Sequence, residues 1–187
     1  ASKNTSKYAC KGKKQANKVA FNPVYRYGNG KKYGTSKLEH DFAVEYLDKL
    51  GLKYIYQFEA KDIKRFYDFA VVVYDNYPYK YEIKDGIRSI LQEGKEFTVG
   101  FLIEVDGDYF HSNPSFIKQK DMNPMQKHNK YVDKLKDEWA KERGMLLLRI
   151  WENDIRHDRG KVVKLINSFM NEAKKRRLIV ENRRKPH

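Results

Sequence analysis

The protein has 187 residues, with 39 Lys and Arg against 25 Asp and Glu, which gives a formal net charge of +14 at pH 7. This length suffices for one domain with its own core, and the single cysteine, Cys10, excludes an intramolecular disulfide and a zinc site built from cysteines. The apolar runs are far shorter than the ~20 residues of a membrane-spanning helix, and none follows the basic N-terminal residues. We therefore expect a cytoplasmic protein with no signal peptide and no membrane partner.

The positive charge is concentrated at the two ends of the chain. Residues 1–38 contain ten basic and no acidic residues, residues 174–187 carry a net charge of +6, and the part between them is slightly acidic. Such arms gain affinity for phosphate backbones by releasing counterions, and tyrosines among the basic residues can stack on bases. We predict basic nucleic-acid-binding arms at 1–35 and 174–187, the alternative being solubilising tails, around a domain at 36–173. The candidate phosphate contacts are Lys11, Lys13, Lys14, Arg26, Lys31, Lys32, Lys174, Lys175, Arg176 and Arg177.

The first predicted element after the arm is a helix from Ser36 to Gly51. Ser36 and Glu39 have the spacing of a capping box, apolar residues recur at helical intervals, and Gly51 supplies the stop signal. Alternating aromatic residues then predict a half-buried strand at 54–58, and a more continuous apolar run predicts a second strand at 66–73.

The middle of the chain gives weaker signals, followed by a strong one. Residues 79–83 indicate a third strand, and glycines flank a short piece at 86–94 that we expect to be irregular or helical. Residues 97–105 form an apolar run that predicts a buried strand.

The last third of the domain predicts a helix at 125–143, a buried strand at Leu146–Trp151 and a final helix around 162–170. Antiparallel strands followed by a helix that crosses over into another strand imply a mixed sheet covered by helices. We therefore predict the α/β class.

Two of the predicted strands are interrupted by acidic residues. Glu104 breaks the apolar run at 101–105 and Asp106 follows it, while Asp68 breaks the second strand in the same way. Charges at the ends of buried strands are costly unless they are paired or bind a metal, and carboxylate oxygens suit a hard divalent cation. The sequence therefore indicates a metal site, the alternative being a strand-end ion pair or a turn aspartate before Gly107.

Five segments extend this pattern along residues 36–158: Ser36–Glu39, Tyr67–Phe69, Ile103–His111, Asn129–Asp133 and Gly144–Glu152. In this order they resemble the PD-(D/E)XK nuclease superfamily, and more narrowly its very-short-patch-repair (Vsr) branch and the related homing endonucleases of phages and mobile introns. The resemblance implies a restriction-endonuclease-like, three-layer core with a mixed central sheet flanked by helices. It also implies a metal-dependent enzyme that hydrolyses phosphodiester bonds in double-stranded DNA.

The resemblance also implies the metal ligands. Asp68 would be the central ligand, Glu104 would occupy the second acidic position, and the Val105 carbonyl would be a further ligand. The cofactor would be Mg²⁺, with Mn²⁺ as a substitute, and no small-molecule cofactor is implied.

Four further residues receive roles by the same resemblance. His111 would act near the attacking water or the leaving group, Glu39 would hold metal-bound water, and Asn129 and Asp133 would orient the site. Two of them have simpler explanations as well. Glu39 can serve only to complete the capping box, and Asp133 can be a solvent-exposed ion-pair partner of the lysines around it, which are Lys130, Lys134 and Lys136.

The sequence departs from the superfamily pattern at Asp106, where a lysine is common. This points to His111 as the group that handles protons, or to Asp106 as an added ligand. A rival motif is Glu82-Ile83-Lys84, in which Lys84 would polarise the water and Glu104 would be an ordinary charge. We favour Glu104 and His111, because they keep the downstream helix and strand in register.

Taken together, the composition and the resemblance lead us to expect a phage or mobile-element homing-type endonuclease that acts in the host-cell cytoplasm. Cleavage of both strands would need a homodimer on DNA or two sequential nicks. The alternatives are a mismatch-repair nickase or a small restriction endonuclease. From another class, the alternative is a non-catalytic DNA-binding protein on a nuclease fold.

Overall fold

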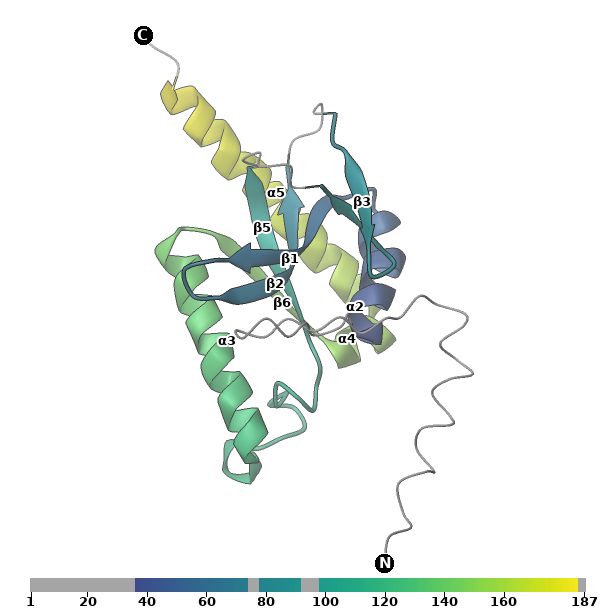
Figure 1. The fold of residues 1–187 in the computed structure, drawn as a ribbon, viewed down its shortest axis with the longest axis vertical. Coiled ribbons are helices and arrows are strands. Elements are labelled where there is room, and N and C mark those ends of the chain that lie inside the picture. Colours follow the sequence, from purple (N-terminus) through teal and green to yellow (C-terminus); the bar gives the residue numbers. More distant parts are fainter. Residues whose placement is uncertain (1–35, 74–77, 92–97, 185–187) are drawn as a thin grey trace, which may run out of the picture.

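The computed structural model describes residues 36–73, 78–91 and 98–184, with side chains described up to residue 177. The arm predicted at 1–35, including its candidate phosphate contacts, lies outside the described residues. The elements in chain order are α2 (Lys37–Phe42), the π-helix η1 (Ala43–Asp48), β1 (Lys53–Ala60), β2 (Arg65–Val72), β3 (Tyr81–Lys84), β4 (Ile87–Ile90), β5 (Val99–Asp106), the 3-10 helix η2 (Gln119–Asp121), α3 (Pro124–Glu142), β6 (Leu146–Trp151), α4 (Glu152–His157) and α5 (Arg159–Arg184) (Figure 1).

The central sheet has four strands in the order β1-β2-β5-β6. The first three are antiparallel neighbours, whereas β6 runs parallel to β5 and is reached through the crossover helix α3. Strands β3 and β4 form a separate two-stranded sheet. The mixed sheet predicted from the sequence is confirmed.

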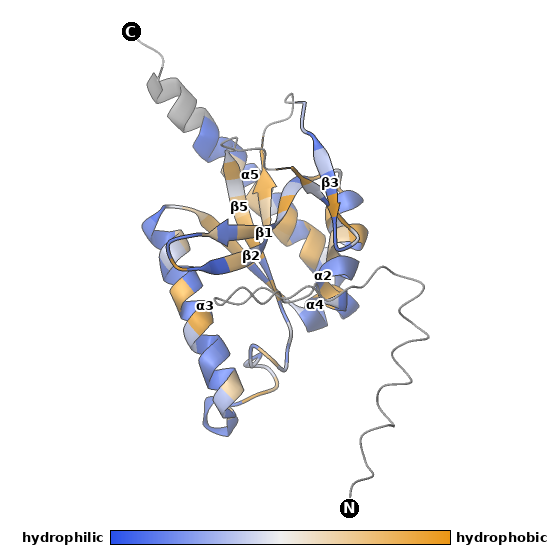
Figure 2. Ribbon diagram, in the orientation of Figure 1, coloured by the Kyte–Doolittle hydropathy of each residue, from blue (hydrophilic) through white to orange (hydrophobic). Residues whose placement is uncertain are grey.

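Helices cover both faces of the sheet. On one face, α2, η1 and α5 pack their apolar side chains, among them Phe42 and Ile166, against Phe69 and Phe101 of the sheet. On the other face, Trp139 of α3 belongs to a second buried cluster that includes Leu102. Figure 2 shows apolar residues along the sheet and on the helix sides that face it. The fold is therefore a three-layer α/β core, as predicted.

Three local expectations need correction. The piece at 86–94 contains strand β4, in which Ile87 and Ile90 are both buried in the core; residues 92–94, like Phe97, lie outside the described residues. The helix that begins at Ser36 continues as a π-helix rather than an α-helix. Residues 174–184, predicted as part of a tail, continue helix α5 beyond the sheet (Figure 1).

Among the described residues, no helix combines the length and apolar character needed to cross a membrane.

Candidate active site

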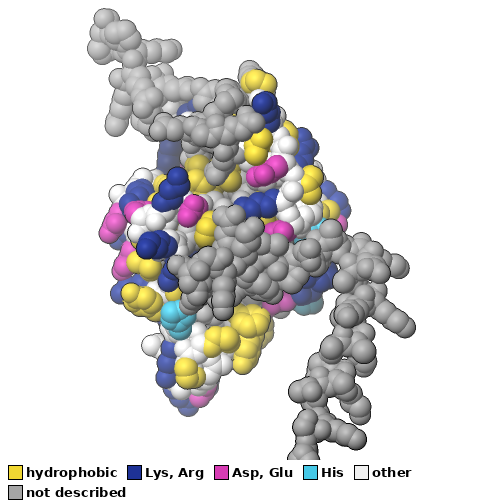
Figure 3. Space-filling model, in the orientation of Figure 1, with side chains coloured by type: hydrophobic (Ala, Val, Ile, Leu, Met, Phe, Trp, Pro, Cys, Tyr) yellow, Lys and Arg dark blue, Asp and Glu magenta, His cyan; other side chains and the backbone are white. Residues whose placement is uncertain are grey.

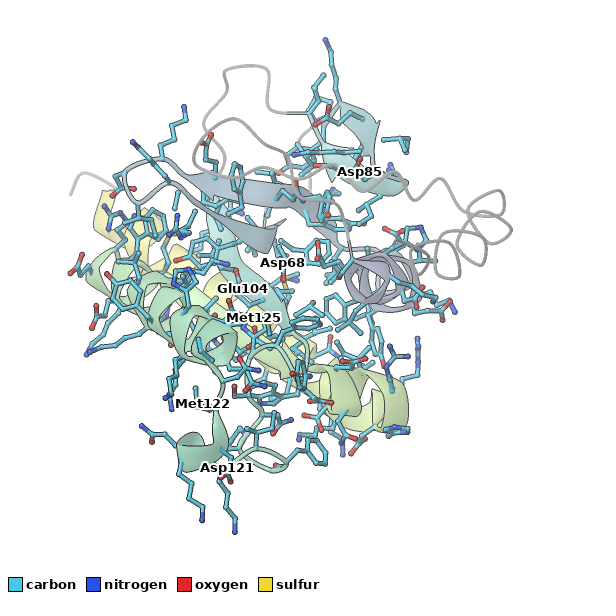
Figure 4. All side chains as sticks on the ribbon, turned by 60° about the horizontal axis from the view of Figure 1, so that its bottom comes forward. Asp68, Asp85, Glu104, Asp121, Met122 and Met125 are labelled. Carbon is cyan, nitrogen blue, oxygen red and sulfur yellow. The ribbon has the colours of Figure 1, made fainter. Side chains whose placement is uncertain are left out.

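Asp68 and Glu104 lie where strands β2 and β5 separate. The last paired residues are Phe69 and Ile103, so the next position in the antiparallel register sets Asp68 opposite Glu104. There the Val105 amide donates a hydrogen bond of 2.7 Å to Asp68 Oδ2, a side-chain acceptor. Figure 4 shows the two carboxylates next to each other at the centre of the molecule. The structure thus brings together the two predicted side-chain ligands, Asp68 and Glu104. Val105 contacts Asp68 through its amide, whereas the predicted ligand is its carbonyl.

Lys136 reaches the Glu104 carboxylate from helix α3, which covers one face of the central sheet. Its Nζ lies 2.8 Å from each of the two carboxylate oxygens of Glu104, and the side chains are 11% and 4% exposed. Tyr67 donates a hydrogen bond of 2.7 Å to the Lys136 carbonyl and packs against Trp139 one turn further along α3. Lys136 is therefore a buried partner of the site, not one of the solvent-exposed lysines expected around Asp133.

Glu39 joins the site from the first helix. Its Oε1 accepts from the Ser36 amide at 3.2 Å while Ser36 Oγ accepts from the Glu39 amide at 3.1 Å, so the predicted capping box is present. The other oxygen, Oε2, accepts a hydrogen bond of 2.8 Å from the hydroxyl of Tyr56, a core residue of β1. The Glu39 carboxylate can therefore cap the helix with one oxygen and face the site of Asp68 and Glu104 with the other.

These carboxylates hold more negative charge than their surroundings compensate. Burial raises the pKa of Asp68 well above its ordinary value of 3.8, and repulsion from Glu104 and Glu39 raises it further. Burial also raises the pKa of Glu39 and Glu104. For Lys136, burial alone would lower the pKa, but attraction by Glu104 and Asp68 outweighs it and the pKa is raised. The ammonium therefore stays charged, and the crowded carboxylates favour the uptake of a proton or of a cation.

A second cluster adjoins the first on its β6 side. His111 Nδ1 lies 2.9 Å from Asp133 Oδ2 and 3.6 Å from Asp106 Oδ1. Arg149, opposite Glu104 in the parallel register, donates through Nη1 to both oxygens of Asp106 at 2.9 and 3.0 Å. Ligand atoms of Asp106, His111 and Asp133 all lie within 4.8 Å of one another, but both carboxylates already have a basic partner, Arg149 for Asp106 and His111 for Asp133.

The acidic neighbours of His111 raise the pKa of its imidazole. Burial would lower the pKa of His111, but the hydrogen bond with Asp133 and the charge of Asp106 outweigh burial and raise the pKa above 6.5. For Asp133, burial acts to raise the pKa, and the interaction with His111 outweighs it and lowers the pKa. The contact between the two side chains therefore favours the charged form of each of them.

Asn129 supports the loop that carries His111 rather than facing the carboxylates. Its side-chain amide donates to the Phe110 carbonyl at 3.0 Å, and Gln126 donates to the Tyr109 carbonyl at 2.7 Å. The rings of Tyr109 and Phe110 are more than half exposed, and Figure 3 shows apolar side chains over this end of the molecule. The beginning of α3 thus holds the loop backbone while the aromatic rings face solvent.

The rival motif lies on the β3–β4 hairpin, outside the central sheet. Glu82 is exposed on β3. The ammonium of Lys84 lies over the ring of Tyr56, 5.7 Å from its centroid. Lys84 thus approaches Tyr56, whose hydroxyl donates to Glu39. None of the described contacts joins Glu82 to Asp68.

The predicted phosphate contacts in the described part of the chain differ in their surroundings. Lys174 and Lys175 are exposed on α5. Arg176 contacts the carboxylate of Glu172, and Arg177 donates to the Val73 carbonyl at 3.0 Å. The two lysines are therefore the better candidates for contacts outside the domain.

Three residues of the site, Lys136, Tyr56 and Arg149, were not predicted from the sequence. A signal existed for Lys136, which lies three residues after Asp133 and three before Trp139 and so shares a helix face with both.

Comparison of the chain with protein-family models, with curated proteins and with solved structures found no match. The assignment of the site therefore rests on its geometry.

Proposed function

We propose that the protein is a metal-dependent endonuclease that hydrolyses phosphodiester bonds in double-stranded DNA. The observation that carries this proposal is the convergence of Asp68, Glu104 and Glu39, from three different elements, around one buried ammonium group. The resemblance of the sequence to the Vsr-like branch of the PD-(D/E)XK nucleases supports the same reaction. Within that branch, the single cysteine, Cys10, disfavours the zinc-containing mismatch-repair enzymes, so we place a homing-type role before mismatch repair or restriction.

The donor set fits a hard divalent cation. Among the described residues, none donates a hydrogen bond to Asp68 Oδ1, so this oxygen is available beside the carboxylate of Glu104. Mg²⁺, or Mn²⁺ in its place, would be held by these oxygens, with the Val105 carbonyl as the further ligand that the resemblance implies. When bound, the ion would neutralise charge on the phosphate and lower the pKa of a water molecule.

His111 is suited to proton donation. Its Nδ1 is engaged by Asp133, which leaves Nε2 without a partner among the described residues. Because its pKa is raised, the protonated form of the ring is favoured, and this form can give a proton from Nε2 to a departing oxygen. We therefore assign it the role of general acid, oriented by Asp133, rather than that of a base for the attacking water.

DNA binding is proposed for the basic ends of the chain. Lys174 and Lys175 lie on the part of α5 that extends beyond the sheet (Figure 1), and residues 1–35 add further positive charge. Basic residues of this kind can neutralise phosphates without reading sequence.

A cleavage assay on supercoiled plasmid tests the proposal. We expect nicked or linear product with Mg²⁺ or Mn²⁺ and none with EDTA, and a time course of the two products shows whether one strand or both are cut. Absence of any product under conditions where the protein binds DNA would count against the enzyme.

A second candidate function is DNA binding without catalysis. The observation that favours it is the pairing of the most buried charges with partners of the protein itself, Glu104 with Lys136 and Asp106 with Arg149. A structural network would show the same pairing. Tight, salt-sensitive DNA binding with no metal-dependent cleavage is the result expected for this alternative.

A further inference from the structure

One ammonium group serves a cluster of three carboxylates. Lys136 contacts both oxygens of Glu104 at 2.8 Å, and its charge also acts on Asp68 and Glu39. We propose that the Lys136 ammonium occupies the place of a second cation, so that the site takes one divalent ion rather than two. This inference rests on the proposed metal-dependent function and specifies the composition of its metal centre.

The balance of charge supports a single ion. Asp68, Glu104 and Glu39 carry three negative charges when ionised, and Lys136 returns one positive charge, so the remainder matches one divalent cation. The neighbouring acids add little to this demand, because Arg149 engages both oxygens of Asp106. With Lys136 replaced by an uncharged side chain, Glu104 would be a buried carboxylate without a counter-ion, and at a pH above its pKa it would take a second cation.

The backbone that carries Lys136 is held in place by the sheet. The Tyr67 hydroxyl donates to the Lys136 carbonyl at 2.7 Å, and the Tyr67 ring lies 5.3 Å from Nζ. One turn further along α3, the indole of Trp139 donates to Asp62 at 2.7 Å. The helix is therefore anchored at Lys136 and again one turn later, which places the ammonium beside Glu104 and the Tyr67 ring.

The test counts Mn²⁺ ions bound by the full-length protein without DNA, using electron paramagnetic resonance of free Mn²⁺. We expect one ion for the unmodified protein, and two for Lys136→Met, because Glu104 then requires a counter-ion. Lys136→Gln, which still donates a hydrogen bond to Glu104, is the second variant and has the same expected count. Lys134→Met is the matched control, since Lys134 lies on the same helix with its side chain 75% exposed, and it should bind one ion.

Two further variants locate the ions. Asp68→Asn should lose the ion of the unmodified protein, and Glu104→Gln combined with Lys136→Met, which removes the carboxylate that requires the second ion, should bind fewer than two ions. One ion in every Lys136 variant, or two in the unmodified protein, would overturn the inference while leaving a metal-dependent function in place. No bound ion in the unmodified protein would instead count against the proposed function itself.

Discussion

Replacing Lys136 with methionine is expected to cost about 3–5 kcal/mol of unfolding free energy, the range for removing one partner of a buried ion pair. The magnitude follows from the burial of the pair, with side chains 11% and 4% exposed and two contacts of 2.8 Å. Methionine keeps most of the side-chain volume, so the loss comes from the unpaired Glu104 carboxylate rather than from a cavity. Urea unfolding in EDTA, followed by circular dichroism, measures it.

Two comparisons identify the cause. Lys134→Met, two residues before Lys136, removes an exposed partner of Glu138, and exposed ion pairs of this kind contribute little or nothing measurable to stability. Glu104→Gln combined with Lys136→Met removes the carboxylate that lost its contact partner and should recover most of the lost stability. The pKa of Glu104 is already raised, and it rises further in Lys136→Met, so the cost should be smallest at low pH, where this carboxyl is protonated. A cost for Lys136→Met no larger than that for Lys134→Met would refute the buried pair.

Three further predictions concern the second cluster, the core and the DNA-binding surface. Because the pKa of His111 is raised in the folded state, its contribution to stability should be complete below about pH 6.5 and decline as the pH rises through the folded pKa. His111→Gln should remove this decline in urea unfolding. Equal pH profiles of stability for the variant and the unmodified protein would argue against the ion pair. Gly100→Ala should lower stability by ~1–3 kcal/mol, because the added methyl would lie 1.8 Å from a valine side chain, whereas Gly160→Ala meets only an ordinary contact and should shift the melting temperature little. Lys174→Gln with Lys175→Gln should reduce the log–log salt slope of DNA binding by ~0.9 for each phosphate that is no longer neutralised, and an unchanged slope would show that neither lysine touches DNA.

The elements with long or strong patterns could be predicted from the sequence. Strand β6 has the predicted bounds, and α3 differs from its prediction by one residue at each end, because the period of their apolar residues is a local property. Strand β4 was not predictable in this way. It has four residues, and Ile87 and Ile90 do not alternate as in a half-buried strand, since each joins a different buried cluster.

The candidate site was predictable where an acid interrupts an apolar strand, as at Asp68 and Glu104. The basic half of the site was not, because the burial of Lys136 depends on how α3 docks on the sheet and not on the pattern within α3. The same holds for Arg149, whose carboxylate partner Asp106 is 43 residues away in sequence and is brought close by the parallel register of β5 and β6. Tyr56 was predicted as a strand residue, but its contact with Glu39 depends on the position of the first helix.

The most direct test of the proposed active site is the rate of Mg²⁺-dependent cleavage by Asp68→Asn, measured alongside its affinity for DNA. Asp121→Asn is the matched control, an exposed aspartate that Figure 4 shows at the edge of the molecule, away from Asp68. We predict that Asp68→Asn loses at least about 10²-fold in rate, as expected when charge stabilisation at the reacting phosphate is removed, while binding DNA as well as the control does. Cleavage by Asp68→Asn at the rate of the control would contradict this assignment.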